Sequence, residues 1–227
     1  MTISVIKPNR DKALFLAKKQ LPAFVCDAVN LEGIHYTLPE VQTLLDGITV
    51  GGHTLSDEKI TLNQAAAWRF LFSAIESGQF ALSQPFACQL HAIAAKEESL
   101  TWGRFRDGGV SIVGTDYQPP AAGELSHCWQ TMETAASAIA KPYERAIFIF
   151  LSMARTQFFY DVNKRMGRFM MNGLLLDQGL PAINLPAARQ LEFNEKMLRF
   201  YQSGDVSEMT GFILTCLDST TVAIMSE

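Results

Sequence analysis

Two successive apolar segments most constrain what this chain can fold into. Residues 142–156 are rich in Phe, Ile and Leu on nearly every side of a helix, and residues 163–178 continue with a second helical pattern that stops at Gly179. A helix that is apolar all round is stable only when it is buried, so the first segment is predicted at the centre of the fold. Residues 157–162 must then form the turn between two central helices.

Weaker local signals predict a mainly α-helical chain. Thr37, Pro39 and Glu40 form a helix-start signature before a short helix over residues 38–46. Amphipathic spacing predicts further helices over residues 62–77, 85–98, 124–140, 187–203 and 206–217. Residues 104–113 alternate around Asp107-Gly108, which predicts a β-hairpin. The expected fold is helical with one hairpin.

Composition narrows the functional classes. Of the 227 residues 48% are hydrophobic and 19% charged, which excludes a disordered chain. The net charge of -4 argues against nucleic acid and anionic membrane as partners. No apolar run approaches a membrane span, and the amino end lacks a signal-peptide core. A cytoplasmic protein is predicted, with reduced thiols at four scattered cysteines: Cys26, Cys88, Cys128 and Cys216. Whether it forms a homo-oligomer stays open.

The turn between the central helices carries the chemistry. A loop that opens a helix exposes unpaired N–H groups at the positive end of the helix dipole, where an anion such as phosphate binds. Arg165 and Arg168 are three residues apart on one face of that helix, and Asp161 offers an oxygen ligand suited to Mg²⁺. The segment therefore predicts a phosphate site. The alternative is an acid at a helix start followed by two solvated arginines.

Residues 157–168 resemble the signature of the Fic family, H-P-F-x-(D/E)-G-N-(G/K)-R-x-x-R. They match it at Phe159, Asp161, Asn163, Lys164, Arg165 and Arg168. The predicted hairpin, with the prolines at 119 and 120, is similar to the Fic flap, and residues 28–33 resemble the family's inhibitory motif (S/T)-x-x-x-E-(G/N). The resemblance covers about residues 24–218. It implies a Fic-type helical bundle with a β-hairpin flap over the active site, divided into an extension with an inhibitory helix (1–60) and a Fic core (61–227).

In Fic enzymes the signature binds ATP with Mg²⁺, and AMP is transferred to a Ser, Thr or Tyr hydroxyl of a target protein. The resemblance implies that Asp161 holds the metal and that Glu32 inhibits by pairing with the second signature arginine. It also implies roles for three sets of residues: nucleotide binding by Asn163, Lys164, Arg165 and Arg168; catalysis by Arg165, Arg168 and the position of Gln157; and target alignment by the flap residues Val110, Ser111 and Ile112.

The main departure from the signature is Gln157, which stands at the position of the catalytic His. A Gln amide cannot accept a proton near neutral pH, so general-base catalysis, typically worth a factor of ~10²–10⁴, is lost. Phe158 and Val162 replace the signature Pro and Gly. Val162 restricts backbone angles that Gly leaves open and crowds a close phosphate approach. Helix-surface or loop positions are expected for the histidines at 35, 53, 91 and 127, so none is expected as a substitute base.

Three hypotheses follow. The first is an autoinhibited protein AMP transferase that is weak or altered because of Gln157. The second is a pseudoenzyme that binds nucleotide or a partner protein without turnover. The third is a phosphotransferase, because Lys164 matches the variant signature of the death-on-curing toxins, which resemble Fic proteins and transfer phosphate.

Overall fold

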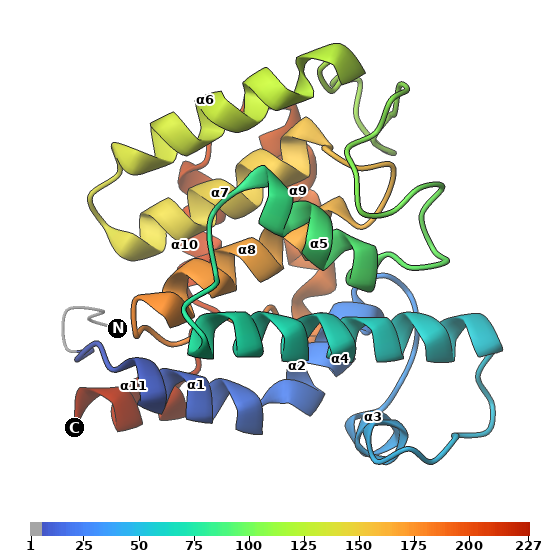
Figure 1. Cartoon of the computed structure of the whole chain (residues 1–227), viewed down its shortest axis with the longest axis vertical. Coiled ribbons are helices and arrows are strands. Elements are labelled where there is room, and N and C mark those ends of the chain that lie inside the picture. The colour runs from blue at the N-terminus through green and yellow to red at the C-terminus, as the bar shows by residue number, and fades with distance from the viewer. Residues whose placement is uncertain (1–5) are drawn as a thin grey trace.

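The computed structural model describes residues 6–227 and contains eleven α-helices and two short 3₁₀-helices within them (Figure 1). The α-helices are α1 (Arg10–Lys19), α2 (Leu21–Asn30), α3 (Leu38–Leu45), α4 (Leu55–Glu76), α5 (Gln84–Ala94), α6 (Leu125–Ser137), α7 (Pro142–Thr156), α8 (Asn163–Asp177), α9 (Gln190–Ser203), α10 (Ser207–Leu214) and α11 (Ser219–Ser226). The short helices are η2 (Ala122–Glu124) and η3 (Ala187–Arg189). The prediction of a mainly α-helical fold is confirmed.

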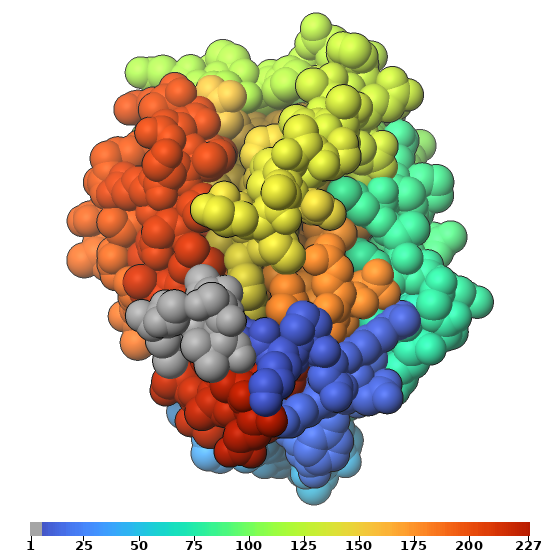
Figure 2. Space-filling view, turned by 90° about the vertical axis from the view of Figure 1, so that its left-hand side faces the viewer, coloured from blue at the N-terminus to red at the C-terminus, as the bar shows by residue number. Residues whose placement is uncertain are grey.

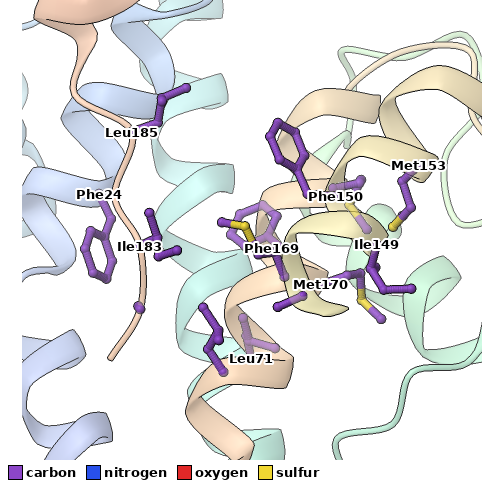
Figure 3. Packing of buried hydrophobic residues seen from close by; sticks show 14 of the residues in the cluster. Phe24, Leu71, Ile149, Phe150, Met153, Phe169, Met170, Ile183 and Leu185 are labelled. Atoms are coloured by element: carbon purple, nitrogen blue, oxygen red, sulfur yellow. The ribbon is translucent and has the colours of Figure 1, made fainter. Parts of the chain in front are cut away.

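Helices α7 and α8 form the centre of the molecule, as predicted from their apolar sequences. Ile149 and Phe150 of α7 and Phe169 and Met170 of α8 are all at most 3% exposed, and they lie in one packed cluster (Figure 3). Gly167 allows the close crossing of the two helices, because a Cβ atom there would lie 2.7 Å from the carbonyl oxygen of Phe150. The central pair thereby fixes both ends of the loop at residues 157–162.

The remaining helices cover this pair. Trp68 of α4 packs against Phe24 of α2 at 4.8 Å and against Phe169 of α8 at 5.2 Å between ring centroids. Helix α6 lies along the other side of α7 (Figure 1). Asn172 of α8 exchanges two hydrogen bonds with the backbone of Ile183 and so fixes the segment that leaves α8.

The two ends of the described chain lie together. Lys12 of α1 donates a hydrogen bond to the carbonyl of Ile224 in α11, and in Figure 2 the blue α1 lies against the red α11. No single helix within residues 6–227 is long and apolar enough to cross a membrane. By length and composition alone, α10 and α11 together meet that test, with a bend of 75° between them.

Capping chemistry sets the helix starts in the amino-terminal part. Thr37 and Glu40 form the predicted capping box of α3. A second capping box, between Thr54 and Asp57, starts α4 seven residues before the predicted start at residue 62. The boundary predicted between residues 60 and 61 falls inside α4. The first five residues of the extension predicted over 1–60 lie outside the described residues.

The predicted β-hairpin is wrong: residues 104–113 form an irregular loop, and the described residues contain no strand. Successive side chains of a strand point to opposite faces, but Phe105 and Arg106 both turn inward. Phe105 packs on Phe158 at 4.9 Å between centroids, and the backbone N–H of Arg106 donates to the carbonyl of Phe158 at 3.0 Å. Val113 is 94% exposed. An isolated two-stranded hairpin is marginal in water, so these inward anchors decide the conformation.

Candidate active site

A cleft of about 600 Å³ opens at the start of α8. One wall is the loop at residues 157–164, and the opposite walls are residues 111–114 and one face of α9. Glu32, which follows α2, closes one side of the cleft. The structure thus brings Glu32, two of the predicted flap residues and most of the signature segment to one cleft. The third flap residue, Val110, does not line it.

The loop between α7 and α8 is held by the side chain of Asn163. Its Oδ1 accepts from the N–H of Phe159 at 2.9 Å, and its Nδ2 donates to the carbonyl of Phe159 at 2.8 Å. Both ends of the loop adopt left-handed backbone angles, with φ of 53° at Gln157 and 66° at Val162. Because the Asn163 side chain is used inside the loop, only its backbone N–H remains for a ligand.

The start of α8 is an open helix N-terminus. Val162 precedes the helix without a side-chain cap, and Asp161 accepts the N–H of Val162 at 2.6 Å. The first-turn amides of Asn163, Lys164 and Arg165 therefore have no capping side chain. Since Asn163 and Lys164 line the cleft, this end of the helix has the geometry of an anion site.

The amide of Gln157 is hydrogen-bonded at both of its ends within the protein. Its Nε2 donates to the carbonyl of Ala154 at 2.6 Å, and its Oε1 accepts from Asn163 Nδ2 at 3.0 Å. Its backbone carbonyl accepts from the buried guanidinium of Arg106 at 2.6 Å, and that guanidinium also binds the carbonyls of Gly108 and Pro120. Arg106 thereby ties the loop after α5 to the end of α7.

Glu32 is fixed by the turn that ends α2. The N–H of Gly33 donates to Asn30 and that of Ile34 donates to Val29, the Schellman arrangement, and Gly33 takes the left-handed φ of 85° that this turn requires. The turn carries the Glu32 carboxylate to the basic side chains at the start of α8.

Glu32 pairs with two signature residues. Its carboxylate lies 3.3 Å from Lys164 Nζ and 3.8 Å from Arg168 Nη2. Burial alone raises the pKa of Glu32, but the positive charges of Lys164, Arg165 and Arg168 outweigh it and hold that pKa below its usual range. Glu32 is therefore a carboxylate across most of the pH range.

Arg168 is a buried guanidinium without a full partner. Its side chain is 10% exposed, and neither Nη1 nor Nη2 has a hydrogen-bond acceptor among residues 6–227. Burial, together with the charge of Arg165, lowers the pKa of Arg168 to about 10, although Glu32 opposes the shift. Arg168 is thus charged at neutral pH, and its two Nη groups remain unsatisfied. Arg168 does not itself line the cleft, whereas its partner Glu32 does.

Arg165 faces away from the cleft, into an ion pair with Glu98. Both Nη groups bind the Glu98 carboxylate, one of them at 2.9 Å, and the Arg165 side chain is only 3% exposed. Burial lowers the pKa of Arg165, but the bonds to Glu98 and the charge of Glu32 raise it above its usual value. Glu98 was missed by sequence reasoning, because it lies 67 residues away and matches no motif.

The expectation of a surface or loop position is wrong for His91, which is 0% exposed under the signature loop. Its ring stacks on Phe159 at 3.8 Å, its Nδ1 accepts from the N–H of Gly103, and its Nε2 lies 3.3 Å from the carbonyl of Asp161. Burial lowers the pKa of His91 to about 4. Both nitrogens are engaged and the ring does not line the cleft, so His91 supports the loop.

Asp161 is the single carboxylate of the loop that could hold a metal ion. Within residues 6–227 no group of three or more His, Cys, Asp or Glu side chains could hold one. Asp161 uses Oδ1 for the N–H of Val162, and its other oxygen accepts no hydrogen bond in the described chain. This donor set suits Mg²⁺, which usually binds proteins through one or two carboxylates and keeps other ligands from water or phosphate.

Fold and site thus define a class of protein. It is a helical domain with an open helix start at α8, where the carboxylate of Glu32 faces the basic side chains of Lys164 and Arg168. Residues 81–175 match the family model described as the Fic/DOC family. Together with the relatives and solved structures described next, this match supports the resemblance of the chain to the Fic family.

The similar sequences are proteins named protein adenylyltransferase Fic. That of Drosophila persimilis is 23% identical over 215 residues, which cover 92% of this chain and 42% of the relative. That of Drosophila melanogaster is also 23% identical, over 92% of this chain and 43% of the relative. The chain therefore spans less than half the length of these relatives.

Two solved structures share the fold. Fic-1 from C. elegans has a TM-score of 0.77 at 18% identity, over 90% of this chain and 61% of that one. A Fic domain containing signaling protein from Bacteroides thetaiotaomicron also has a TM-score of 0.77, at 16% identity, over 98% of this chain and 92% of that one.

Proposed function

We propose that this chain binds ATP in the 600 Å³ cleft and transfers its AMP group to a Ser, Thr or Tyr hydroxyl of a target protein, as a weak and autoinhibited Fic-type adenylyltransferase. The observation that carries the proposal is the open start of α8 with Lys164 and Arg168 beside it and Glu32 across them. The relatives named protein adenylyltransferase support the same reaction class.

In the proposed complex the backbone amides of Asn163 and Lys164 bind phosphate oxygens, and Arg168 binds the terminal phosphate. The unsatisfied Nη groups of Arg168 support this role, because a buried guanidinium gains most from a bidentate phosphate partner. Arg165, paired with Glu98, positions the helix start rather than contacting the nucleotide.

Asp161 would hold the Mg²⁺ ion that accompanies ATP, through the carboxylate oxygen that has no other partner in residues 6–227. Bound there, Mg²⁺ would neutralise phosphate charge. Asp161 itself stays anchored through its hydrogen bond to the N–H of Val162, so the loop presents the ligand oxygen in a fixed place.

The proposed transfer forms a bond from the target hydroxyl oxygen to the α-phosphorus and breaks the bond to the bridging oxygen, so that diphosphate leaves. The hydroxyl proton passes to solvent water, because the Gln157 amide cannot accept it and is already bonded at both ends. The loss of a general base makes the step slow. Ser111 and Ile112 line the cleft opposite the loop, and no backbone hydrogen bonds tie residues 110–113 to the rest of the described chain, so an extended target segment can pair there.

Glu32 is proposed to restrain the reaction. Its carboxylate occupies the basic groups that the terminal phosphate needs, so ATP must displace it or bind with that phosphate elsewhere. Removal of the carboxylate should therefore strengthen nucleotide binding.

A second candidate is a pseudoenzyme that binds nucleotide or a partner protein without turnover, and the closed hydrogen bonding of Gln157 favours it. A third is phosphate transfer, which rests on Lys164 in the signature. Adenylyl transfer, phosphate transfer and absence of turnover leave different masses on the protein, so mass spectrometry separates them.

Titration calorimetry with Mg²⁺ and ATP tests the nucleotide site. We expect Glu32→Gly to bind about tenfold more tightly than the native protein, a gain of about 1.4 kcal/mol, because an opposing carboxylate is removed. Asp116→Gly is the matched control: it removes an acid from an exposed loop position outside the cleft lining and should leave affinity unchanged. If no variant binds ATP, the proposed nucleotide site is contradicted. If Glu32→Gly and the native protein bind ATP equally well, the proposed autoinhibition by Glu32 is contradicted.

A further inference from the structure

A second cavity, of about 480 Å³, is lined by residues of α6, α7 and α9. It shares no lining residue with the candidate active site. Its volume falls within the range of roughly 300–1,000 Å³ that is typical of small-molecule sites. Its floor is the partly exposed stripe of α7 that includes Phe148, Ser152 and Arg155.

The charged group of this cavity is Arg155, and its guanidinium is held rigidly without an acid. Nε donates to the carbonyl of Tyr201 at 3.1 Å, and Cζ stacks over the ring of Tyr117 at 3.9 Å. Gly204, which ends α9, lies against the guanidinium, because a Cβ atom there would be in van der Waals contact with Cζ at 3.4 Å. Neither Nη group has a protein partner among residues 6–227, and no Asp or Glu lines the cavity.

The walls around Arg155 combine apolar side chains with polar ones, and the polar ones are His127, Thr131, Ser152 and Thr156. Met132 comes from α6, Phe148 from α7 and Phe200 from α9, and Val206 closes the end. A fixed guanidinium binds a carboxylate through two parallel hydrogen bonds, and its prior ordering by the protein reduces the entropy lost on binding. One unpaired guanidinium beside these apolar side chains suits a ligand with one negative charge and a hydrocarbon body.

We propose that this cavity is a binding site for a small organic carboxylate with an aromatic or branched aliphatic body, anchored by Arg155. The carboxylate accepts from the two Nη groups, and the hydrocarbon lies against Met132, Phe148 and Phe200. The proposal is independent of the nucleotide site, and its test uses no nucleotide.

NMR of the methionine methyl groups, with 3-phenylpropionate as the probe, tests the site directly. Met132 lines the cavity, whereas Met153 is buried outside its lining and serves as the internal reference. We expect a saturable shift of the Met132 methyl group with 3-phenylpropionate, and about tenfold weaker binding of the neutral 3-phenylpropanamide. Arg155→Gln should reduce affinity for the acid to that of the amide.

A second pair of variants keeps the test valid if Arg155→Gln perturbs folding. Ala135→Phe adds a side chain at an exposed α6 position that lines the cavity, and it should abolish the shift. Thr134→Phe adds the same side chain at the neighbouring exposed position outside the lining and should leave binding intact. The proposal is overturned if the probe gives no saturable Met132 shift, if acid and amide bind equally, or if Ala135→Phe binds as well as Thr134→Phe.

Discussion

Glu98 binds both Nη groups of Arg165 and joins the turn after α5 to the first turn of α8. The two residues are 67 positions apart in sequence, and Arg165 is almost completely buried. This ion pair lies beneath the open helix start, so it sets the position of the amides that line the cleft.

Glu98→Gln should destabilise the protein strongly. The change leaves the buried Arg165 charge without its partner, which typically costs about 3 kcal/mol or more. The neighbouring Glu97 provides the matched control, because its pair with Lys59 is exposed and its loss should change stability little. Urea unfolding of the two variants measures the difference, and equal stability of Glu97→Gln and Glu98→Gln would show that the buried pair is not needed.

At position 162, replacement by Gly should give a more stable protein than replacement by Ala. Its φ of 66° lies in the left-handed region, where a Cβ atom costs about 1 kcal/mol, so Val162→Gly should be more stable than Val162→Ala by about that amount. Val206, with a φ of -78°, is the control, and there Ala should be the more stable replacement. Thermal unfolding of the four variants measures the order of stability at each position. If the Ala variant is the more stable one at both positions, the strained loop geometry is contradicted.

Because of His91, the free energy of unfolding should decrease as the pH is lowered from neutral. Its pKa of about 4 in the folded protein lies below the ordinary value of 6.5, so the unfolded chain takes up the proton first as pH falls. Each pH unit in this interval then costs up to about 1.4 kcal/mol, and the integrated loss between pH 6.5 and 5 is about 1.6 kcal/mol.

The free energy of unfolding measured at several pH values tests this dependence. His91→Gln should remove the loss of stability between pH 6.5 and 5, because no ionisable ring remains at that position. His127→Gln, at an exposed position, should retain this loss of stability. Identical pH profiles for the native protein and His91→Gln would contradict a buried neutral ring.

The sequence was sufficient to predict those parts of the fold that depend on local chemistry. The centre of the fold followed from the uniform apolar character of α7, and the start of α3 followed from the Thr37–Glu40 capping box. The start of α4 was misplaced because the second capping box, at Thr54, was not used. The hairpin failed because two tertiary anchors, the Phe105 ring and the Arg106 guanidinium, outweigh the weak local preference of Asp107-Gly108.

In the candidate site, too, one part could be predicted from local sequence and another part could not. The open start of α8 and its basic residues are encoded in one continuous segment, so they were found together. Glu98 and His91 support that segment from α5 and the turn after it, and nothing near them in sequence signals the contact. Only the packing of α5 against α8 brings them there.

The transferred group is the most direct test of the central claim. Intact-mass spectrometry would follow Mg²⁺ and ATP incubation of the native protein, Glu32→Gly, and Glu32→Gly combined with Gln157→His. We predict an AMP adduct that is weak on Glu32→Gly and forms about 10²-fold faster when the general base is restored. The adducts measured are those of self-modification, and a phosphate adduct in place of the AMP adduct on any of the three proteins would contradict adenylyl transfer by this site.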